Sequence, residues 1–253
     1  MWPIEKLNSI KNSGAISSYY WSALYQQEPA PEGGGIFKKS SFRYFTQQGD
    51  YYILELPNGE RKYVEDNKCN KIITVDTANK VTNTSDYTAM GVWAITPDGD
   101  ILLTHLVRDR IGYADILNKL IYLNGYYRPQ FIGIENMGIA IQLITEARLK
   151  NLPVKALEPE GKGKQNRANL PMGAVIRMEN GKIYFPKHAS YLDDIELELL
   201  TFPKGKSDEI VDILSYLCNE LTKVDMFDNS DFMPYSLEQG LPSGMRKNHG
   251  FSF

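Results

Sequence analysis

The chain has 253 residues, of which 42% are hydrophobic and 23% are charged, and its formal charge at pH 7 is −3. These proportions exclude a disordered chain, a collagen-like repeat and a small disulfide-stapled protein. The acidic balance argues against a broadly basic nucleic-acid coat, whereas a nucleic-acid enzyme needs only a local contact surface.

The two cysteines, Cys69 and Cys218, are isolated in the sequence. A zinc site built on cysteine requires closely spaced ligand pairs, so we expect free, buried thiols in a reducing compartment. No apolar run approaches the roughly 20 residues that span a bilayer. The first residues also lack the charged-then-apolar order of a secretion signal. We therefore expect a cytosolic protein without a membrane partner.

Residues 1–35 are predicted to lead into the main fold as a linker. A short helix is expected over 17–27, and Pro29 and Pro31 are followed by three glycines at 33–35. Alternating prolines stiffen the chain and consecutive glycines let it swivel. The pattern thus predicts a stiff piece followed by a hinge.

A β-hairpin is predicted after the linker. Two β-rich runs, at 51–56 and 61–64, flank the turn residues Asn58 and Gly59. Both turn residues tolerate the positive φ that tight hairpin turns require.

The core of the fold is predicted to begin at Lys71. Short apolar, β-rich runs predict six strands, at 71–75, 87–95, 101–107, 131–134, 154–157 and 182–185. Apolar residues at helical spacing predict helices from 113, over 138–150, up to 178, over 189–200 and over 207–221. This order indicates an α/β fold with a mixed sheet, antiparallel at first and then parallel, covered by helices. The chain is thereby divided into 1–35, a domain over 36–222 and an extended polar tail over 223–253.

Acidic side chains follow two of the predicted strands. Asp76 ends the first core strand and Glu135 ends the fourth. Functional groups of open α/β sheets collect outside the carboxyl ends of strands, so these two acids are expected to meet. A single strand-final acid is often only a turn former or helix cap, and the pairing therefore carries the argument. A turn of small polar residues could also bring Asp86 back beside Asp76, although Ser-Asp before a strand is in itself an ordinary loop ending.

The last predicted helix adds further acids. Asp208 and Asp212 share one stripe of this helix, and like charges four residues apart repel each other unless a cation lies nearby. Simple complementarity with the helix dipole would explain Asp208 and Glu209 near the helix start, but not Asp212. Carboxylates from two strand ends and one helix suit Mg²⁺ or Mn²⁺. Two such ions about 3.5–4 Å apart would activate a water and stabilise the leaving oxygen of a phosphodiester.

Four segments in a fixed order resemble the large terminase subunits of tailed bacteriophages. They are a linker over 21–37, a first nuclease motif in 75–78 with 85–89, a second over 133–136 and a third over 208–214. The resemblance covers about residues 20–222. It implies a ribonuclease H-like fold and a metal-dependent endonuclease that cuts double-stranded concatemeric viral DNA, with little sequence specificity, in the host-cell cytoplasm. The implied partners are the portal protein, the small terminase subunit and the packaging ATPase domain.

The resemblance also implies roles for individual acids. Asp76, Glu135 and Asp212 would be the catalytic residues and main ligands of Mg²⁺ or Mn²⁺, with two ions expected. Asp208 would be a further ligand or a supporting acid, and Asp86 and Glu209 would be supporting acids. Family members often carry His-Asp-Asp where this chain has Ser207-Asp208-Glu209.

A glycine-punctuated basic segment follows the strand over 154–157. Its side chains Lys162, Lys164 and Arg167 could contact DNA phosphates without reading the base sequence. The competing interpretation of this segment is a solvated loop. With the resemblance to terminases, we favour the phosphate contact.

A packaging ATPase needs a phosphate loop of the form G-x-x-x-x-G-K-[ST], and the sequence contains none. We therefore expect a nuclease domain without the motor half, which does not hydrolyse ATP by itself. Two alternatives stay open. One is a docking module that relays motor force while its own cutting is weak or suppressed, and the other is a resolvase- or transposase-like nuclease of the same fold.

Overall fold

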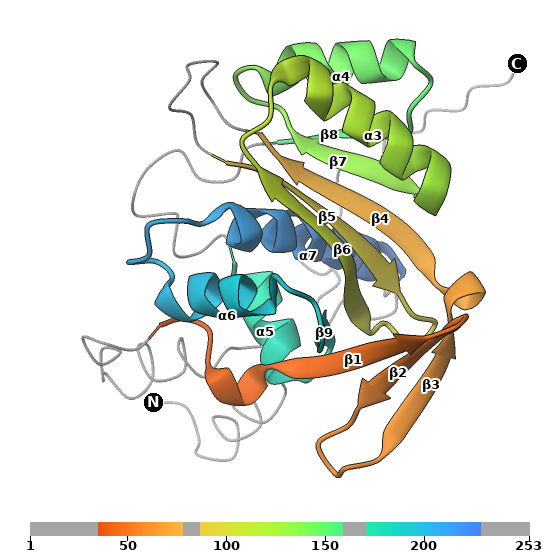
Figure 1. Ribbon diagram of the computed structural model, residues 1–253, viewed down its shortest axis with the longest axis vertical. Helices are drawn as coiled ribbons and strands as arrows, with labels where there is room; N and C mark the ends of the chain where they lie inside the picture. Colours follow the sequence, from red (N-terminus) through yellow and green to blue (C-terminus); the bar gives the residue numbers. More distant parts are fainter. Residues whose placement is uncertain (1–34, 78–86, 159–170, 229–253) are drawn as a thin grey trace, which may run out of the picture.

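The computed structural model describes residues 35–77, 87–158 and 171–228 (Figure 1). Several predicted features lie outside these residues: the helix over 17–27, almost all of the linker, Asp86, the basic side chains Lys162, Lys164 and Arg167, and the tail from residue 229. The elements of the described part follow the predicted order along the chain.

One mixed sheet of nine strands forms the centre of the described fold, in the order β3-β2-β1-β9-β6-β5-β4-β7-β8. Antiparallel pairing joins β1 to β2, β2 to β3, β4 to β5 and β5 to β6. Parallel pairing joins β9 to β1 and β6, and β7 to β4 and β8. The predicted mixed α/β sheet is thereby confirmed. The strands are β1 (Arg43–Gln48), β2 (Tyr51–Glu55), β3 (Arg61–Glu65), β4 (Asn70–Asp76), β5 (Thr88–Ile95), β6 (Ile101–Asp109), β7 (Phe131–Glu135), β8 (Val154–Leu157) and β9 (Ile183–Pro186).

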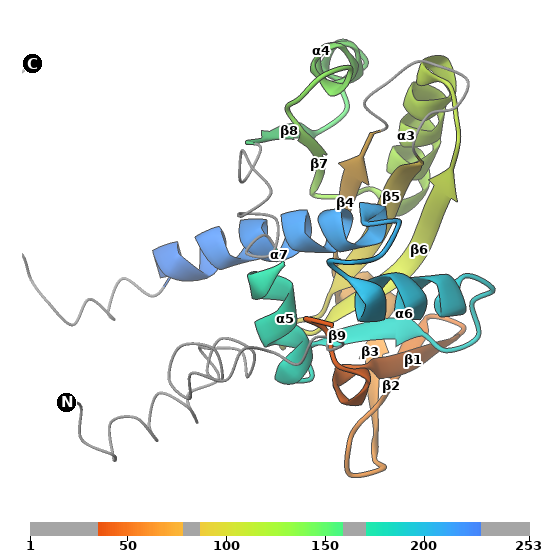
Figure 2. The ribbon, with the colours of Figure 1, turned by 90° about the vertical axis from the view of Figure 1, so that its left-hand side faces the viewer.

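Helices cover both faces of the sheet (Figure 2). One face carries α3 (Tyr113–Tyr127) and α4 (Ala140–Leu149). The other face carries α5 (Met172–Glu179), α6 (Leu192–Thr201) and α7 (Glu209–Asp228). Two short 3₁₀ helices, η1 (Lys39–Ser41) and η2 (Asp66–Lys68), flank the first three strands.

The alternation of side chains along a strand explains why the sheet has a hydrophobic core on each face. On β5, Met90 and Val92 are buried with the α3 and α4 side chains, whereas Ala89 and Trp93 are buried with those of α5, α6 and α7. Both cysteines of the chain are buried and free, as predicted. No helix in the described part is long and apolar enough to cross a bilayer.

The predicted hairpin is present, but it belongs to a larger extension of the sheet. β2 and β3 pair across a turn in which Gly59 adopts a φ of +83°, a conformation that favours glycine. The strand beside them, β1, was not predicted. It pairs in parallel with β9, where Phe45 is opposite Pro186, and antiparallel with β2 across the turn at Gly49 and Asp50.

Helix α7 is longer than the sequence pattern indicated, since it continues to Asp228. The predicted boundary of the domain at residue 222 therefore falls inside this helix. Ile210, Leu214 and Leu217 form its fully buried side, as their helical spacing predicted, and α5 packs against it.

The described chain begins against the connection between α6 and α7. The Ile36 backbone N–H donates a hydrogen bond to the Phe202 carbonyl oxygen at 3.4 Å. Gly35 lies so close to the end of α6 that a Cβ atom there would be 2.2 Å from the Leu200 carbonyl oxygen. Ile36 and Phe37 are buried in the same cluster as the first turn of α7. The start of the domain is thus fixed to the segment that leads into α7.

Candidate metal centre

The carboxyl ends of neighbouring strands place a row of residues along one edge of the sheet. Asp76 on β4 is opposite Ala89 on β5, and Ala89 is opposite Arg108 on β6. On the other side of β4, Val75 is opposite Ile134 in the parallel pair with β7. The next residues along these two strands are Asp76 and Glu135, so both acids end adjacent strands at one level of the sheet. This is the arrangement that the strand ends predicted.

Helix α7 is fixed across the face toward which Asp76 points. The buried Thr74 hydroxyl donates a hydrogen bond to the Ile213 carbonyl oxygen at 2.8 Å and accepts one from Trp93 Nε1 at 2.7 Å. Thr74 lies two residues before Asp76 on the same face of β4, and Ile213 directly follows Asp212. The bond therefore sets Asp212 of the helix against the ends of the strands.

Tyr216 lies among the three acids. It follows Asp212 by one helical turn, its side chain is only 7% exposed, and its hydroxyl donates a hydrogen bond to Glu135. Burial, together with the charges of Asp76, Asp212 and Glu135, raises the pKa of Tyr216 far above its ordinary value. Burial also raises the pKa of Glu135, and the hydrogen bond from Tyr216 opposes this rise in part. Carboxylates from β4, β7 and α7 thus act on one phenol, which keeps its proton.

The remaining predicted acids differ in their surroundings. Asp208 stands just ahead of α7 and is half-buried, and its carbonyl oxygen accepts a hydrogen bond from the Asp212 N–H at 2.8 Å. Glu209 is buried and is engaged in an ion pair, with its Oε2 3.1 Å from Nη2 of Arg108. The roles predicted for Asp208 and Glu209 stay predictions, as does that of Asp86 outside the described residues.

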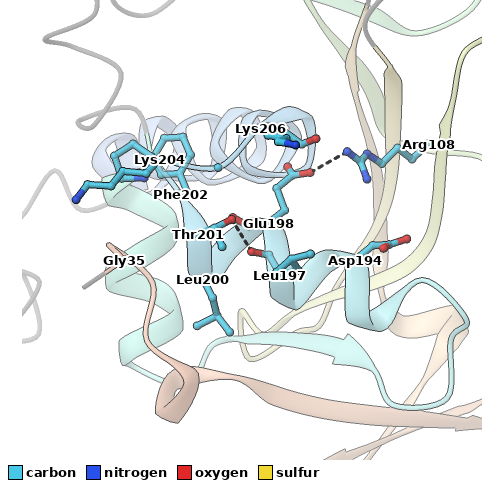
Figure 3. A pocket seen from close by; sticks show the side chains of 13 residues that line it. Gly35, Arg108, Asp194, Leu197, Glu198, Leu200, Thr201, Phe202, Lys204 and Lys206 are labelled. Atoms are coloured by element: carbon cyan, nitrogen blue, oxygen red, sulfur yellow. Dashed lines mark hydrogen bonds and ion pairs between the residues drawn. The ribbon is translucent and has the colours of Figure 1, made fainter. Parts of the chain in front are cut away.

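An acid that was not predicted, Glu198, holds the start of α7 in place. Glu198 on α6 is 4% exposed, and its Oε1 accepts hydrogen bonds from the Ile210 and Val211 N–H groups at 2.6 and 3.2 Å. These N–H groups belong to the first turn of a helix, which has no partner for them within the helix itself. Arg108 Nη2 lies 3.4 Å from the other carboxylate oxygen (Figure 3). Burial raises the pKa of Glu198 to about 7, against the opposing effects of the backbone N–H groups and Arg108.

A pocket of about 630 Å³ opens beside this ion pair, between α6 and the segment that leads into α7 (Figure 3). Its lining combines Arg108 and Glu198 with Leu197, Phe202 and Lys204. Asp76, Glu135 and Asp212 are not among the lining residues, so the pocket is separate from the acid cluster.

Basic side chains also reach the edge of the sheet where the acids lie. β6 runs parallel to β4, so its end with Arg108 and Arg110 lies at that same edge. The guanidinium groups of Arg108 and Arg110 lie over the Tyr87 ring, 4.6 and 4.8 Å from its centroid. Arg110 is exposed, which leaves the edge of its guanidinium open to an anionic ligand.

The donor set at the acid cluster fits a hard divalent cation. Three carboxylates from separate elements supply oxygen ligands only, which favours Mg²⁺ or Mn²⁺ over zinc. As the side chains stand, no group of three or more His, Cys, Asp or Glu residues in the described ranges is arranged to hold a metal ion. Since like charges repel each other without a cation, metal binding would require these carboxylates to turn toward a common point.

Sequence reasoning missed Tyr216, Arg108 and Glu198. Tyr216 was detectable in principle, because it stands four residues after Asp212 on the stripe that carries the acids. Arg108 and Glu198 gave no local signal, since their contacts join β6, α6 and α7 across about 100 residues of sequence.

A family model described as the terminase RNaseH-like domain matches residues 73–221. No curated protein matches the chain. The chain is similar to the crystal structure of the large terminase nuclease from thermophilic phage G20c with bound cobalt, at 16% identity and a TM-score of 0.54. That comparison covers 75% of this chain and 99% of the other.

The same phage nuclease with bound magnesium is similar at 16% identity over 75% of this chain and 99% of the other, with a TM-score of 0.53. A large terminase from a second thermophilic bacteriophage is similar at 10% identity, with a TM-score of 0.56. This chain covers 52% of that longer protein, and 85% of this chain is matched. At identities this low, the structural similarity shows a common fold and nothing more.

Proposed function

The chain belongs to the terminase RNaseH-like domain family, and on that premise we propose that it is a metal-dependent endonuclease of viral genome packaging. Its substrate would be double-stranded concatemeric DNA, cut with little sequence specificity. The reaction would be hydrolysis of a phosphodiester bond assisted by two Mg²⁺ or Mn²⁺ ions.

The convergence of Asp76, Glu135 and Asp212 carries this proposal. Three carboxylates from two strand ends and one helix act on a single buried hydroxyl, and that of Glu135 is bonded to it. A buried acid with a perturbed pKa, such as Glu135, is typical of functional sites. The G20c nuclease, which shares the fold, has structures with bound cobalt and with bound magnesium.

Each element has a definite task in the proposed reaction. Asp76, Glu135 and Asp212 would hold the cations, with Asp208 as a further ligand or a supporting acid. Bound divalent ions supply activation of the attacking water and stabilisation of the leaving oxygen. Thr74 and Glu198 keep α7, and with it Asp212, in place against the strand ends.

Contacts to the DNA backbone would come from basic side chains near the acids. Lys162, Lys164 and Arg167 remain predicted phosphate contacts. Within the described residues, Arg110 is exposed over Tyr87 at the edge of the sheet that carries Asp76. An arginine stacked on an aromatic ring keeps its N–H donors in a fixed plane, which suits recognition of a phosphate.

The proposed setting is the host cytoplasm during virus assembly, with the portal protein, the small terminase subunit and the packaging ATPase as partners. We assign ATP hydrolysis to the packaging motor and not to this chain. A docking module that only relays force would bind no Mn²⁺ at the acid cluster. A resolvase-like nuclease would prefer branched DNA to linear duplex.

Substitution of Asp76 by Ala tests the proposal. Plasmid cleavage in Mn²⁺ should fall at least about 100-fold, because a metal centre supplies several kcal/mol and each ~1.4 kcal/mol is a factor of ten. Asp98→Ala removes an exposed acid from the turn between β5 and β6 and is the matched control, with cleavage unchanged. Full cleavage by Asp76→Ala would refute the assignment.

A further inference from the structure

Tyr216 holds a position that the proposed chemistry does not yet explain. Its hydroxyl donates a hydrogen bond to Glu135, which ends β7, while the tyrosine itself is on α7. Asp76 and Asp212 lie close enough for their charges to act on the same phenol. A neutral donor is therefore bonded to one of the three acids and lies within the electrostatic influence of the other two.

The position of the phenol is fixed by the helix that bears it. Three residues before Tyr216, the Ile213 carbonyl oxygen is held by the Thr74 hydroxyl at 2.8 Å. One turn after Tyr216, Glu220 forms an ion pair with Lys155 on β8. Leu217 and Cys218, which follow Tyr216 directly, are fully buried. A shift of α7 at Tyr216 would break these contacts, so the backbone that carries the phenol is held in place by the fold.

We propose that Tyr216 is a positioning residue of the metal centre, whose hydroxyl holds one oxygen of Glu135 and so directs the other toward Asp76 and Asp212. This inference rests on the proposed metal-dependent nuclease. Groups that hydrogen-bond to a metal-ligating carboxylate fix its orientation, and their loss typically costs about 10–100-fold in metal affinity or activity. The ring of Tyr216 packs in the core, whereas its hydroxyl orients the Glu135 carboxylate.

The experiment compares Tyr216→Phe with Tyr52→Phe in the full chain. Both substitutions keep a ring and remove one phenol hydroxyl that is bonded to a carboxylate, because Tyr52 is 2% exposed and its hydroxyl donates to Asp66. Tyr52 lies on β2 in the hairpin, away from the acid cluster, so Tyr52→Phe is the matched control. The measurements are Mn²⁺ binding by titration calorimetry without DNA, and plasmid cleavage over a range of Mn²⁺ concentrations.

Tyr216→Phe is expected to weaken Mn²⁺ binding, and to raise the Mn²⁺ concentration for half-maximal cleavage, by about 10–100-fold. Excess Mn²⁺ should restore most of the cleavage rate. Tyr52→Phe should leave both quantities unchanged. If Tyr216 only packed the helix, Tyr216→Phe would lower the melting temperature without moving the Mn²⁺ dependence, and that result would overturn the inference.

Glu135→Gln provides a second test that does not depend on the stability of one variant. If the hydroxyl acts through Glu135, Tyr216→Phe should have little further effect on Mn²⁺ binding once Glu135→Gln is present. Additive losses would contradict a role through Glu135. A wild-type chain that neither binds Mn²⁺ nor cuts DNA would refute the proposed function itself. A wild type that does both, with Tyr216→Phe equal to it, would refute only the role of Tyr216.

Discussion

Acidic side chains serve different purposes at the two ends of the central strands. Near the hairpin, Asp100 lies between Lys62 and Lys182, at 2.5 and 3.0 Å from their Nζ atoms. At the other end, Asp76 and Glu135 are joined by Asp212 around the hydroxyl of a tyrosine. The first arrangement pairs an acid with two lysines, whereas the second brings acids of three separate elements to one phenol.

The pKa directions show the same contrast. Burial would raise the pKa of Asp66 near the hairpin, but its hydrogen bonds with Lys71 and Tyr52 outweigh this and lower it. For Glu135 burial prevails, and its pKa is raised in spite of the bond from Tyr216. The charged form of an acid is thus favoured at one end and disfavoured at the other. The balance between burial and pairing at each acid, which the net charge of −3 does not reveal, separates Asp66 from Glu135.

Removing an acid from the cluster of Asp76, Glu135 and Asp212 should have the largest effect, because it removes a proposed ligand of the metal. Mn²⁺ at about 100 times its Kd is expected to raise the free energy of unfolding of the wild type by about 2.7 kcal/mol. Asp212→Asn should lose most of this gain. The stability of each chain without metal is the reference against which this gain is measured. Chemical denaturation with and without Mn²⁺ measures both quantities.

The corresponding change near the hairpin serves as the control. Asp100→Asn should lower the free energy of unfolding by about 2 kcal/mol, less than for a fully buried pair because both lysines are partly exposed. It should keep the whole stabilisation by Mn²⁺. Equal Mn²⁺ stabilisation of Asp212→Asn and the wild type would erase the distinction between the two ends.

Glu198 on α6 offers a further test of whether burial or pairing decides the pKa of an acid. Its pKa is about 7 in the fold, above the ordinary value near 4.5, so its contribution to stability is complete below that ordinary value and is lost as the pH rises toward 7. Between pH 5 and 6 the free energy of unfolding should fall by about 1 kcal/mol from this group. Glu198→Gln, followed by denaturant unfolding at both pH values, should remove that fall. A slope unchanged by the substitution would assign the titration to other groups.

The smallest expected effect concerns Arg110, which lies over Tyr87 at the edge of the sheet that carries the acids. Arg110→Ala, made in the non-cutting Asp76→Ala background, should weaken DNA binding a few-fold and reduce the slope of log K against log salt by about 1. Arg148→Ala on α4 removes an exposed arginine from the opposite helical layer and should leave the slope unchanged. Fluorescence anisotropy at several salt concentrations distinguishes the two variants. Equal slopes for both would place the DNA away from Tyr87 and Arg110.

The sequence allowed good prediction wherever the signal was local. Asp76 and Glu135 each end a short apolar run, and the carboxyl ends of parallel strands meet at one edge of a sheet. The hairpin turn at Asn58 and Gly59 was visible for the same reason, since its backbone requirement is met by two adjacent residues.

The parts that depend on distant contacts could not be predicted in this way. The parallel pairing of β1 with β9, which comes from the other end of the domain, has no local signal in the sequence. Glu209 was expected among the supporting acids, but its ion pair with Arg108 depends on a strand about 100 residues earlier. Tyr216 had the right spacing, yet an aromatic residue on a helix gives no sign of its use until the element beneath it is known.

The attachment of Gly35 and Ile36 to the end of α6 has a mechanical consequence. Tension on the chain ahead of Gly35 is borne first by the bond from Ile36 to Phe202 and by the buried Ile36 and Phe37 side chains. Phe202 caps the end of α6 and begins the connection to α7, whose first turn is held by Glu198. The point of loading is therefore connected to the helix that bears Asp212 through one short segment. A pull at residue 35 acts on that connection as well as on β1, into which the chain itself continues.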